Sequence, residues 1–299
     1  MTRVGVVAHA GKTIQGGLPQ LRRTLAEHGV DDPLWAEVDK SRKAPKQLKR
    51  LLGEGVDLVF VWGGDGMAQR SVDVLAGTDV PMAIVPAGTA NLLATNLGIP
   101  KDIEDAVQTG LAGCRRRIDA IRMNDERFAV MAGAGFDADM IRAADGGLKD
   151  KLGRAAYLWT GARSFRQPPF TAKITVDSSP WFGGEASCIL AGNVGALFAG
   201  VQVFEDAEPD DGLLDIAVVT ADGMAQWART VGRTIAGTPD RSPFFRSTKG
   251  RTVSVKLDRK VRYELDGGDR SRIKSYDLEV EPHAVTICVP AGSNRNGES

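Results

Sequence analysis

The sequence is poor in the residues that build disulfides and metal centres. It has only three cysteines and three histidines in 299 residues, each distant from the others along the chain. Cysteines without a metal-ligand spacing are expected to be reduced, buried thiols. The scattered histidines argue equally against a zinc site or a Ser-His-Asp triad. These residues are Cys114, Cys188, Cys288, His9, His28 and His283.

Long apolar runs and an excess of one charge are also absent. No segment reaches the ~20 apolar residues that a transmembrane helix requires, and residues 1–8 predict a strand rather than a signal peptide. Basic and acidic residues both number 38, so the formal net charge is zero. We therefore expect a cytoplasmic protein that binds no nucleic acid and meets a membrane only peripherally.

The pattern of apolar residues changes near residue 122. Before it, strands alternate with helices, which predicts a mostly parallel sheet covered on both faces. The expected strands are 4–8, 34–38, 56–62 and 82–85, and the expected helices are 18–28, 44–52, 69–75, 92–97 and 102–111, the last capped by Asp102.

After that point short alternating stretches dominate, which predicts a β-rich sandwich domain. We expect an α/β domain over residues 1–122, joined by a returning segment over about 284–299, and a sandwich over 123–283. Two helical interludes are expected in the sandwich, over about 151–164 and 224–235. The expected strands there include 172–176, 185–191, 214–219, 253–257, 261–265, 278–280 and 284–289.

Two strands of the α/β region end in glycine-rich turns. The first apolar run ends in Gly63-Gly64-Asp65-Gly66-Met67, and the second ends in Gly88-Thr89-Ala90-Asn91. Glycines let a ligand approach the backbone amides closely, and amides at the start of a helix suit phosphate. Asp65 is suited to hold a metal or orient a hydroxyl, and Thr89 is suited either to contact a ligand or to cap a helix.

These motifs, together with Ala207–Asp215 and Leu265-Asp266-Gly267-Gly268, resemble the diacylglycerol kinase catalytic-domain family of bacterial lipid kinases, which sphingosine kinases share. The resemblance implies a Rossmann-like domain, of the NAD kinase and phosphofructokinase type, followed by a β-sandwich. It also implies ATP and Mg²⁺ as cofactors, and transfer of the γ-phosphoryl group to a lipid hydroxyl, with diacylglycerol as the foremost acceptor. An NAD kinase-like enzyme and a non-catalytic nucleotide- or lipid-binding protein remain the alternatives. The sequence leaves the oligomeric state open, a homodimer included.

The resemblance assigns roles to individual residues. The nucleotide contacts are Gly63, Gly64, Asp65, Gly66, Met67, Gly88, Thr89, Asn91 and a residue after the second strand, either Ser41 or Asp39. Met67 stands where the family commonly has Thr. A structural Mg²⁺ maps to Asp211 with the carbonyls of Glu208 and Leu213, although an acidic surface loop is the plain alternative.

The general base is the weak point of the resemblance. Family members read Asp-Gly-Glu where this chain has Asp266-Gly267-Gly268, so the expected glutamate is missing. Asp266 or Asp269 is the candidate replacement, with Asp266 preferred because it is expected at a strand end. Otherwise the base is dispensable, or the protein is a weak kinase or only a binder. Both carboxylates also suit a plain β-turn.

Overall fold

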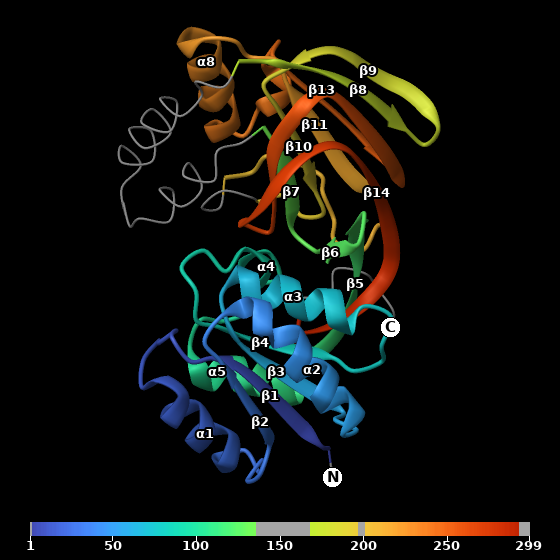
Figure 1. The fold of residues 1–299 in the computed structure, drawn as a ribbon. Helices are drawn as coiled ribbons and strands as arrows, with labels where there is room; N and C mark the ends of the chain where they lie inside the picture. Colours follow the sequence, from blue (N-terminus) through green and yellow to red (C-terminus); the bar gives the residue numbers. More distant parts are fainter. Residues whose placement is uncertain (1, 136–167, 197–200, 293–299) are drawn as a thin grey trace. The chain divides into compact units, whose positions relative to one another are not determined.

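The computed structural model describes residues 2–135, 168–196 and 201–292, and the chain divides into two compact units. The first unit contains Met1–Ala120 and Pro282–Ser299, and the second contains Ile121–Glu281. The sequence places both boundaries two residues later. Strands β5 (Cys114–Met123) and β14 (Gly268–Val289) carry the chain from one unit to the other (Figure 1).

The first unit is built on four parallel strands in the order β2-β1-β3-β4. All six residues of β3 are buried, as expected for a strand with helices over both faces. The end of β14 adds a further parallel neighbour, because Ile287 pairs with Met82 of β4. The strands are β1 (Val4–His9), β2 (Leu34–Val38), β3 (Leu58–Gly63) and β4 (Met82–Pro86). The predicted parallel sheet is thereby confirmed.

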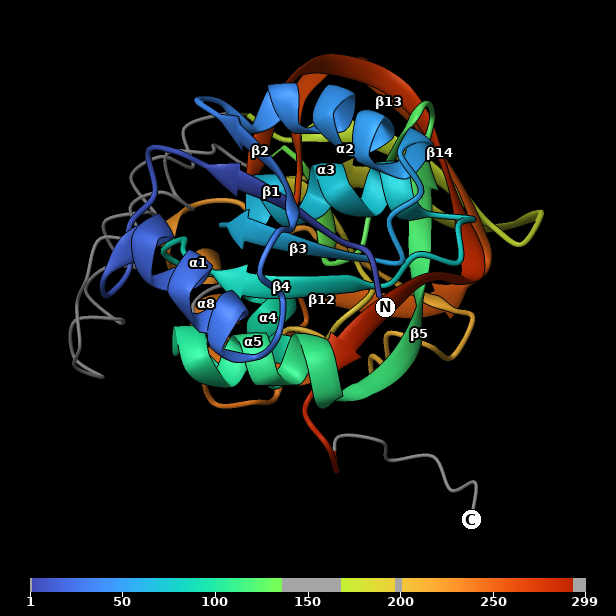
Figure 2. The same cartoon turned by 90° about the horizontal axis from the view of Figure 1, so that it is seen from below.

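Helices cover both faces of this sheet, with α1 and α5 on one side and α2 and α3 on the other (Figure 2). Helix α5 packs closely on β3, since a side chain at Gly110 would lie 2.4 Å from the Phe60 ring. Asp102 caps α5 as predicted, accepting hydrogen bonds from the amides of Glu104 and Asp105. The helices are α1 (Gly17–Glu27), the 3-10 helix η1 (Ser41–Lys43), α2 (Ala44–Gly53), α3 (Asp65–Leu75), α4 (Leu92–Asn96) and α5 (Ile103–Ala112).

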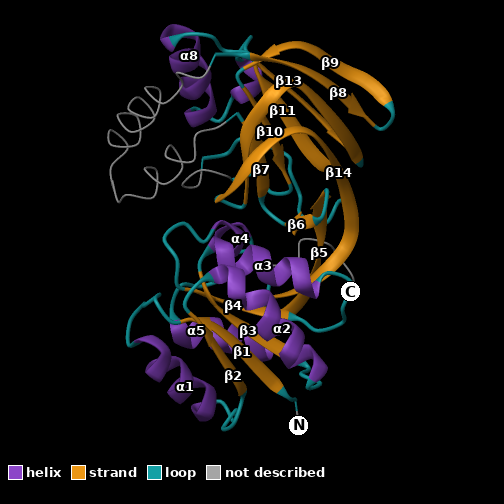
Figure 3. Cartoon of the chain, in the orientation of Figure 1, coloured by secondary structure: helices purple, strands orange, loops and turns teal. Residues whose placement is uncertain are grey.

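The second unit is dominated by antiparallel strands (Figure 3). Its main order is β12-β11-β10-β7-β13-β14, with β8 beside β13 and β9 beside β8. This confirms the β-rich second domain. The elements are β6 (Glu126–Phe128), β7 (Met131–Ala134), β8 (Phe170–Val176), β9 (Ser179–Ala186), β10 (Cys188–Gly192), β11 (Leu214–Val219), α8 (Met224–Ile235), η4 (Pro239–Arg241), β12 (Phe245–Gly250) and β13 (Thr252–Leu265).

Two pairs of predicted short strands are in fact single long strands. Residues 253–257 and 261–265 both lie in β13, and residues 278–280 and 284–289 both lie in β14. The pairing register shifts between Lys256 and Val261, so an irregularity lets the strand continue through the polar stretch where the alternation breaks. The predicted helix over 151–164 lies outside the described residues.

The core of the second unit is formed by the inward faces of its strands. Trp181 and Phe182, which sit beside two glycines in the sequence, pack against this core while remaining partly exposed. The aromatic pair is therefore part of the packing of the sandwich.

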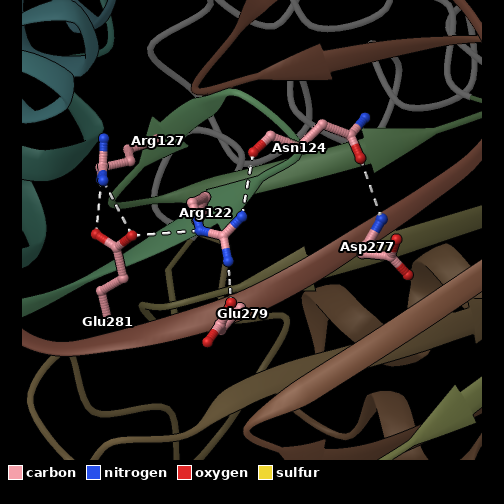
Figure 4. Close-up of polar contacts among 6 residues, drawn as sticks. All are labelled: Arg122, Asn124, Arg127, Asp277, Glu279 and Glu281. Carbon is pink, nitrogen blue, oxygen red and sulfur yellow. Dashed lines mark hydrogen bonds and ion pairs between the residues drawn. The ribbon is translucent and has the colours of Figure 1, made fainter.

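An ion-pair network ties the β5–β6 hairpin to β14 (Figure 4). Arg127 forms two hydrogen bonds to Glu281, at 2.6 and 3.0 Å. Arg122 also reaches Glu281, at 3.4 Å, and pairs with Glu279. Because Glu281 is the last residue of the second unit before β14 enters the first, the network anchors that strand just before it leaves.

Candidate functional site

The two glycine turns of the first unit meet backbone to backbone. Strands β3 and β4 are neighbours, and the Ala87 amide donates to the Gly63 carbonyl at 2.8 Å where both strands end. A Cβ atom added to Gly64 would lie 2.9 Å from the Gly88 Cα, and one added to Gly88 would lie 2.4 Å from the Gly64 Cα. Only glycine permits this approach, so Gly64 and Gly88 bring the two backbones together at the carboxyl edge of the sheet.

Asp65 joins the two turns through its carboxylate. It is the first residue of α3, and its Oδ2 and Oδ1 accept hydrogen bonds from the amides of Asn91 and Leu92, at 2.9 and 2.5 Å. These amides belong to the start of α4, where a negative charge is favourable. Asp65 therefore positions the second turn against the first, a role that the sequence alone does not reveal because the partners lie 26 and 27 residues away.

Asn91 closes its own turn instead of pointing toward a ligand. Its Oδ1 accepts from the Gly88 amide and its Nδ2 donates to the Gly88 carbonyl, both at 2.9 Å. The side chain is 5% exposed, and its backbone adopts φ 51°, a conformation that Asn tolerates. The expectation of an Asn91 side chain that contacts nucleotide is corrected in this way, because both polar atoms of its amide already bond within the turn.

Thr89 is left exposed at the surface of the same turn. The N-cap of α4 is Asn91, two residues later, so Thr89 does not cap this helix. The capping alternative for Thr89 is thereby wrong. Its exposed side chain beside the Gly88 backbone agrees with the ligand-contacting alternative.

The structure separates Ser41 from Asp39. A Cβ atom added to Gly66 would lie 3.3 Å from the Ser41 Oγ, so Ser41 borders the first glycine turn. Asp39 is exposed and pairs with Lys43 at 2.8 Å. Met67 is 1% exposed and packs under Gly63, so it supports the turn from the core. Ser41 is therefore the better placed of the two candidates.

The loop after β1 reaches the same edge of the sheet. The Trp62 Nε1 donates to the Lys12 carbonyl at 3.1 Å, which ties this loop to the end of β3. A small pocket of the first unit opens beside the turns. It is lined by Val61, Gly63, Gly64, Asp65, Ala68, Ile84, Asn91, Leu93 and Ala94.

The predicted metal turn of the second unit is occupied by a lysine. Asp211 Oδ1 accepts from the Leu213 amide at 2.9 Å. The Lys249 ammonium lies 3.5 Å from Asp211 Oδ2 and 3.4 Å from Asp215 Oδ2, and donates to the Asp206 carbonyl. Burial raises the pKa of Asp215 to about 6, an effect that Lys249 opposes.

This arrangement does not fit a divalent cation. Glu208 is exposed in the same turn, and among the described residues no three His, Cys, Asp or Glu side chains are grouped as metal ligands. Lys249 already supplies the positive charge that Asp211 needs. The predicted site at Glu208, Asp211 and Leu213 is thus corrected to a lysine-bridged acidic turn.

Asp266 and Gly267 form the two-residue turn between β13 and β14, with φ 45° and 75°. The Asp266 carboxylate accepts from the amides of Ala129, Val130 and Met131, at 3.2, 3.0 and 2.8 Å. Asp266 is 3% exposed, so this geometry supports a structural role in the turn. The candidate base Asp269 lies beyond the turn and is exposed.

The place of the missing glutamate is filled by Arg270. A Cβ atom added to Gly268 would lie 2.8 Å from Arg270 Nη1. The Arg270 guanidinium holds Glu126 with contacts of 2.8 to 3.1 Å. Arg270 is thus bound to Glu126, and its Nη1 also donates to the carbonyls of Gly268 and Asp269, at 3.1 and 3.2 Å.

Sequence reasoning missed Glu264 on β13. This side chain is 2% exposed, and neither carboxyl oxygen has a hydrogen-bond partner within the described part of the chain. Burial raises its pKa to about 8, with a further contribution from the carboxylates of Asp269 and Asp266. Alternation places Glu264 on the face opposite the core residues Val261 and Leu265, so the sequence pattern gave no signal of its burial.

Comparison with known proteins agrees with this organisation. Residues 6–123 match the diacylglycerol kinase catalytic domain, and residues 130–289 match the YegS C-terminal NAD kinase beta sandwich-like domain. The chain is 29% identical to a "Probable lipid kinase YegS-like" of Klebsiella pneumoniae over 91% of this chain and 92% of that protein. It is 34% identical to an uncharacterized protein of Synechocystis sp. over 74% of this chain, and spans half of that longer protein.

Solved structures show the same fold. A diacylglycerol kinase from Bacillus anthracis aligns with a TM-score of 0.75 at 19% identity, covering 98% of both chains. An NAD kinase from Archaeoglobus fulgidus in complex with ATP aligns at 0.56 and 10% identity, over 98% of this chain and 96% of that one. With both family matches in chain order and one spanning more than half of the sequence, the protein belongs to the diacylglycerol kinase family of YegS-type lipid kinases.

Proposed function

We propose that this protein is an ATP-dependent lipid kinase that transfers the γ-phosphoryl group to the hydroxyl of diacylglycerol, forming phosphatidic acid. The observation that carries the proposal is the contact between the Gly64 and Gly88 turns, with Asp65 holding the start of α4. Phosphoryl transfer depends on positioned phosphates and electrostatic stabilisation more than on covalent help from the protein. The backbone amides around the Gly64–Gly88 contact would give such positioning.

Several residues of the first unit would contact the nucleotide, each in a different way. Amides of residues 63–66 and of Thr89 would hold the phosphates. The exposed Thr89 hydroxyl and the Ser41 hydroxyl beside Gly66 would supply further contacts. Asp65 would keep the two turns in register. Mg²⁺ would enter with ATP and neutralise phosphate charge.

The lipid acceptor is proposed from family membership, and with it peripheral association with a membrane surface. Among the described residues no helix is both long and apolar enough to cross a bilayer. A lipid substrate would then be reached from the membrane surface.

The test is phosphoryl transfer from γ-labelled ATP by the purified protein. Diacylglycerol in mixed micelles, NAD, and buffer alone would be offered as acceptors in parallel, with products separated chromatographically. Labelled phosphatidic acid is the expected product. Labelled NADP instead would identify an NAD kinase-like enzyme, and ATP binding without transfer to either acceptor would identify a nucleotide-binding protein.

A further inference from the structure

Helix α8 of the second unit exposes a face that is mostly apolar. Its inner side is anchored by Trp227, which is 6% exposed, and by Thr230, whose Oγ1 lies 2.9 Å from the Ser242 Oγ. The exposed positions recur at spacings of three and four residues, so they share one side of the helix. A helix face in water is normally polar, whereas this face has a single polar side chain, that of Arg229. The exposed face consists of Ala225, Ala228, Arg229, Gly232 and Ile235.

Ile235 is the largest apolar residue of this face. At 46% exposure it is the one large hydrophobic side chain that stands open to solvent among those the structure describes. The end of the helix is held in place, because the Thr238 amide donates to the Arg233 carbonyl at 2.9 Å and the Gly237 amide to the Thr234 carbonyl at 3.0 Å. A single exposed isoleucine is ordinary, but this one extends a helix face that is already apolar.

The surroundings of α8 are positively charged. Residues 224–246 include four arginines and one acidic residue, whereas the whole chain has a net charge of zero. None of these arginines forms an ion pair within the described part of the chain, and the one acidic residue, Asp240, accepts a hydrogen bond from Ser247. Guanidinium groups that are open to solvent suit phosphate groups. The four are Arg229 and Arg233 on α8, Arg241 on η4 and Arg246 on β12.

The β11–β12 ladder separates these arginines from the acidic turn of the same unit. Arg246 pairs with Val218, near the end of β11 from which the chain enters α8. Lys249 pairs with Asp215 at the opposite end, where the lysine-bridged acidic turn lies. The second unit therefore has a positive end at α8. Such a charge distribution orients a protein toward an anionic surface and keeps the acidic turn away from it.

We propose that α8 is a docking surface for an anionic bilayer, with Ile235 entering the interface and Arg229 and Arg233 contacting lipid phosphates; this inference rests on the proposed function, which needs a lipid substrate. Helices that lie in the membrane interface combine an apolar face with basic side chains, whose long stems let the charge reach the phosphates. A chain without net charge has no global attraction to such a surface. Binding then depends on this local patch.

The experiment is co-sedimentation of the full chain, without ATP, with vesicles of phosphatidylcholine alone or mixed with phosphatidylglycerol. The parent should bind the mixed vesicles and not the neutral ones. Since each arginine near an anionic surface contributes roughly fivefold, Arg229→Gln/Arg233→Gln should weaken binding roughly 25-fold. Ile235→Ser should weaken it roughly tenfold through lost apolar burial. The control Arg262→Gln/Arg272→Gln changes two exposed arginines on β13 and β14 and should match the parent.

Thermal melting followed by circular dichroism shows which variants are folded. A folded arginine variant that binds like the parent would overturn the inference, and so would an equal loss in the control. If the arginine variant does not fold, Ile235→Ser decides, because its unchanged binding would overturn the inference in the same way. A parent that binds neither vesicle would also overturn it and leave the face to an acidic protein partner.

Kinase activity is measured separately, on a short-chain diacylglycerol that is soluble without vesicles. A parent that phosphorylates this lipid but ignores anionic vesicles would refute the docking surface and leave the kinase function standing. A parent that binds anionic vesicles through α8 but phosphorylates no diacylglycerol would refute the proposed function instead.

Discussion

Replacing Glu264 with glutamine should change the stability of the protein in a strongly pH-dependent way. The folded protein holds this carboxyl group in a buried site with a pKa of about 8, against an ordinary value of 4.5. Between these values the folded state keeps a proton that the unfolded chain releases. The folded state therefore binds more protons, and the free energy of unfolding falls as pH rises through this window.

The magnitude follows from the two pKa values. The difference between 4.5 and about 8, at about 1.4 kcal/mol per pH unit, makes the parent roughly 5 kcal/mol less stable above pH 8 than below pH 4.5 through this group alone. Glutamine cannot ionise, so the variant lacks this loss. Its unpartnered amide should cost about 1–3 kcal/mol at every pH.

The assay is urea denaturation of the parent, Glu264→Gln and the control Glu185→Gln, which changes an exposed carboxylate on β9, at half-unit steps from pH 5 to pH 9. The stability of Glu264→Gln relative to the parent should increase steadily up to about pH 8, while the control difference stays constant. The Glu264→Gln variant would then be more stable than the parent at alkaline pH. A Glu264→Gln difference that does not vary with pH would refute the buried, protonated carboxyl group.

Four further outcomes follow from the site. Asp65→Ala should lower kcat by at least ~100-fold. It should also lower the free energy of unfolding by about 1–3 kcal/mol, because two backbone amides lose their acceptor. An active and fully stable variant would contradict this. Thr89→Ala should weaken ATP binding in calorimetric titration without lowering Tm, because Thr89 caps no helix; unchanged affinity would remove it from the site. Mg²⁺ without nucleotide should leave the Tm of the parent unchanged. It should raise the Tm of Lys249→Met, because the lysine no longer neutralises the acidic turn. A rise in the Tm of the parent would support the predicted metal site at Asp211. Gly268→Glu should not raise kcat, since its side chain must displace Arg270; a large gain would show that the natural chain lacks a working base.

The local pattern of residues was enough to predict most of the first unit. Strands such as 34–38 and the cap at Asp102 follow from apolar periodicity and a side chain that accepts amides nearby in sequence. The glycine turns were also visible, because a glycine cluster after an apolar run is a local signal. Strand β4 and the change to a β-rich second unit could also be predicted, because both appear as local patterns of apolar residues.

The partners of the site residues were decided by tertiary structure. The contact between Gly64 and Gly88, the bonds from Asp65 to α4 and the place of Lys249 all join residues far apart in the chain. No periodicity encodes such pairs. The alternation of β13 breaks at a bulge, so two short strands were predicted where one continuous ladder forms.

Glu264 is the clearest example of a residue whose environment the sequence pattern does not predict. Its type and position in the sequence are those of an ordinary polar residue on a strand that alternates with water-facing neighbours. Burial and the absence of hydrogen-bond partners, which set its pKa, arise only when β7, β13 and β14 assemble. The sequence by itself determined the fold family and the two glycine-rich turns, because these depend on local chain geometry. The packing of distant strands alone decided the partners of the carboxylates. Asp65 and Asp266 accept hydrogen bonds from amides, Asp211 pairs with a lysine, and Glu264 has no hydrogen-bond partner among the described residues.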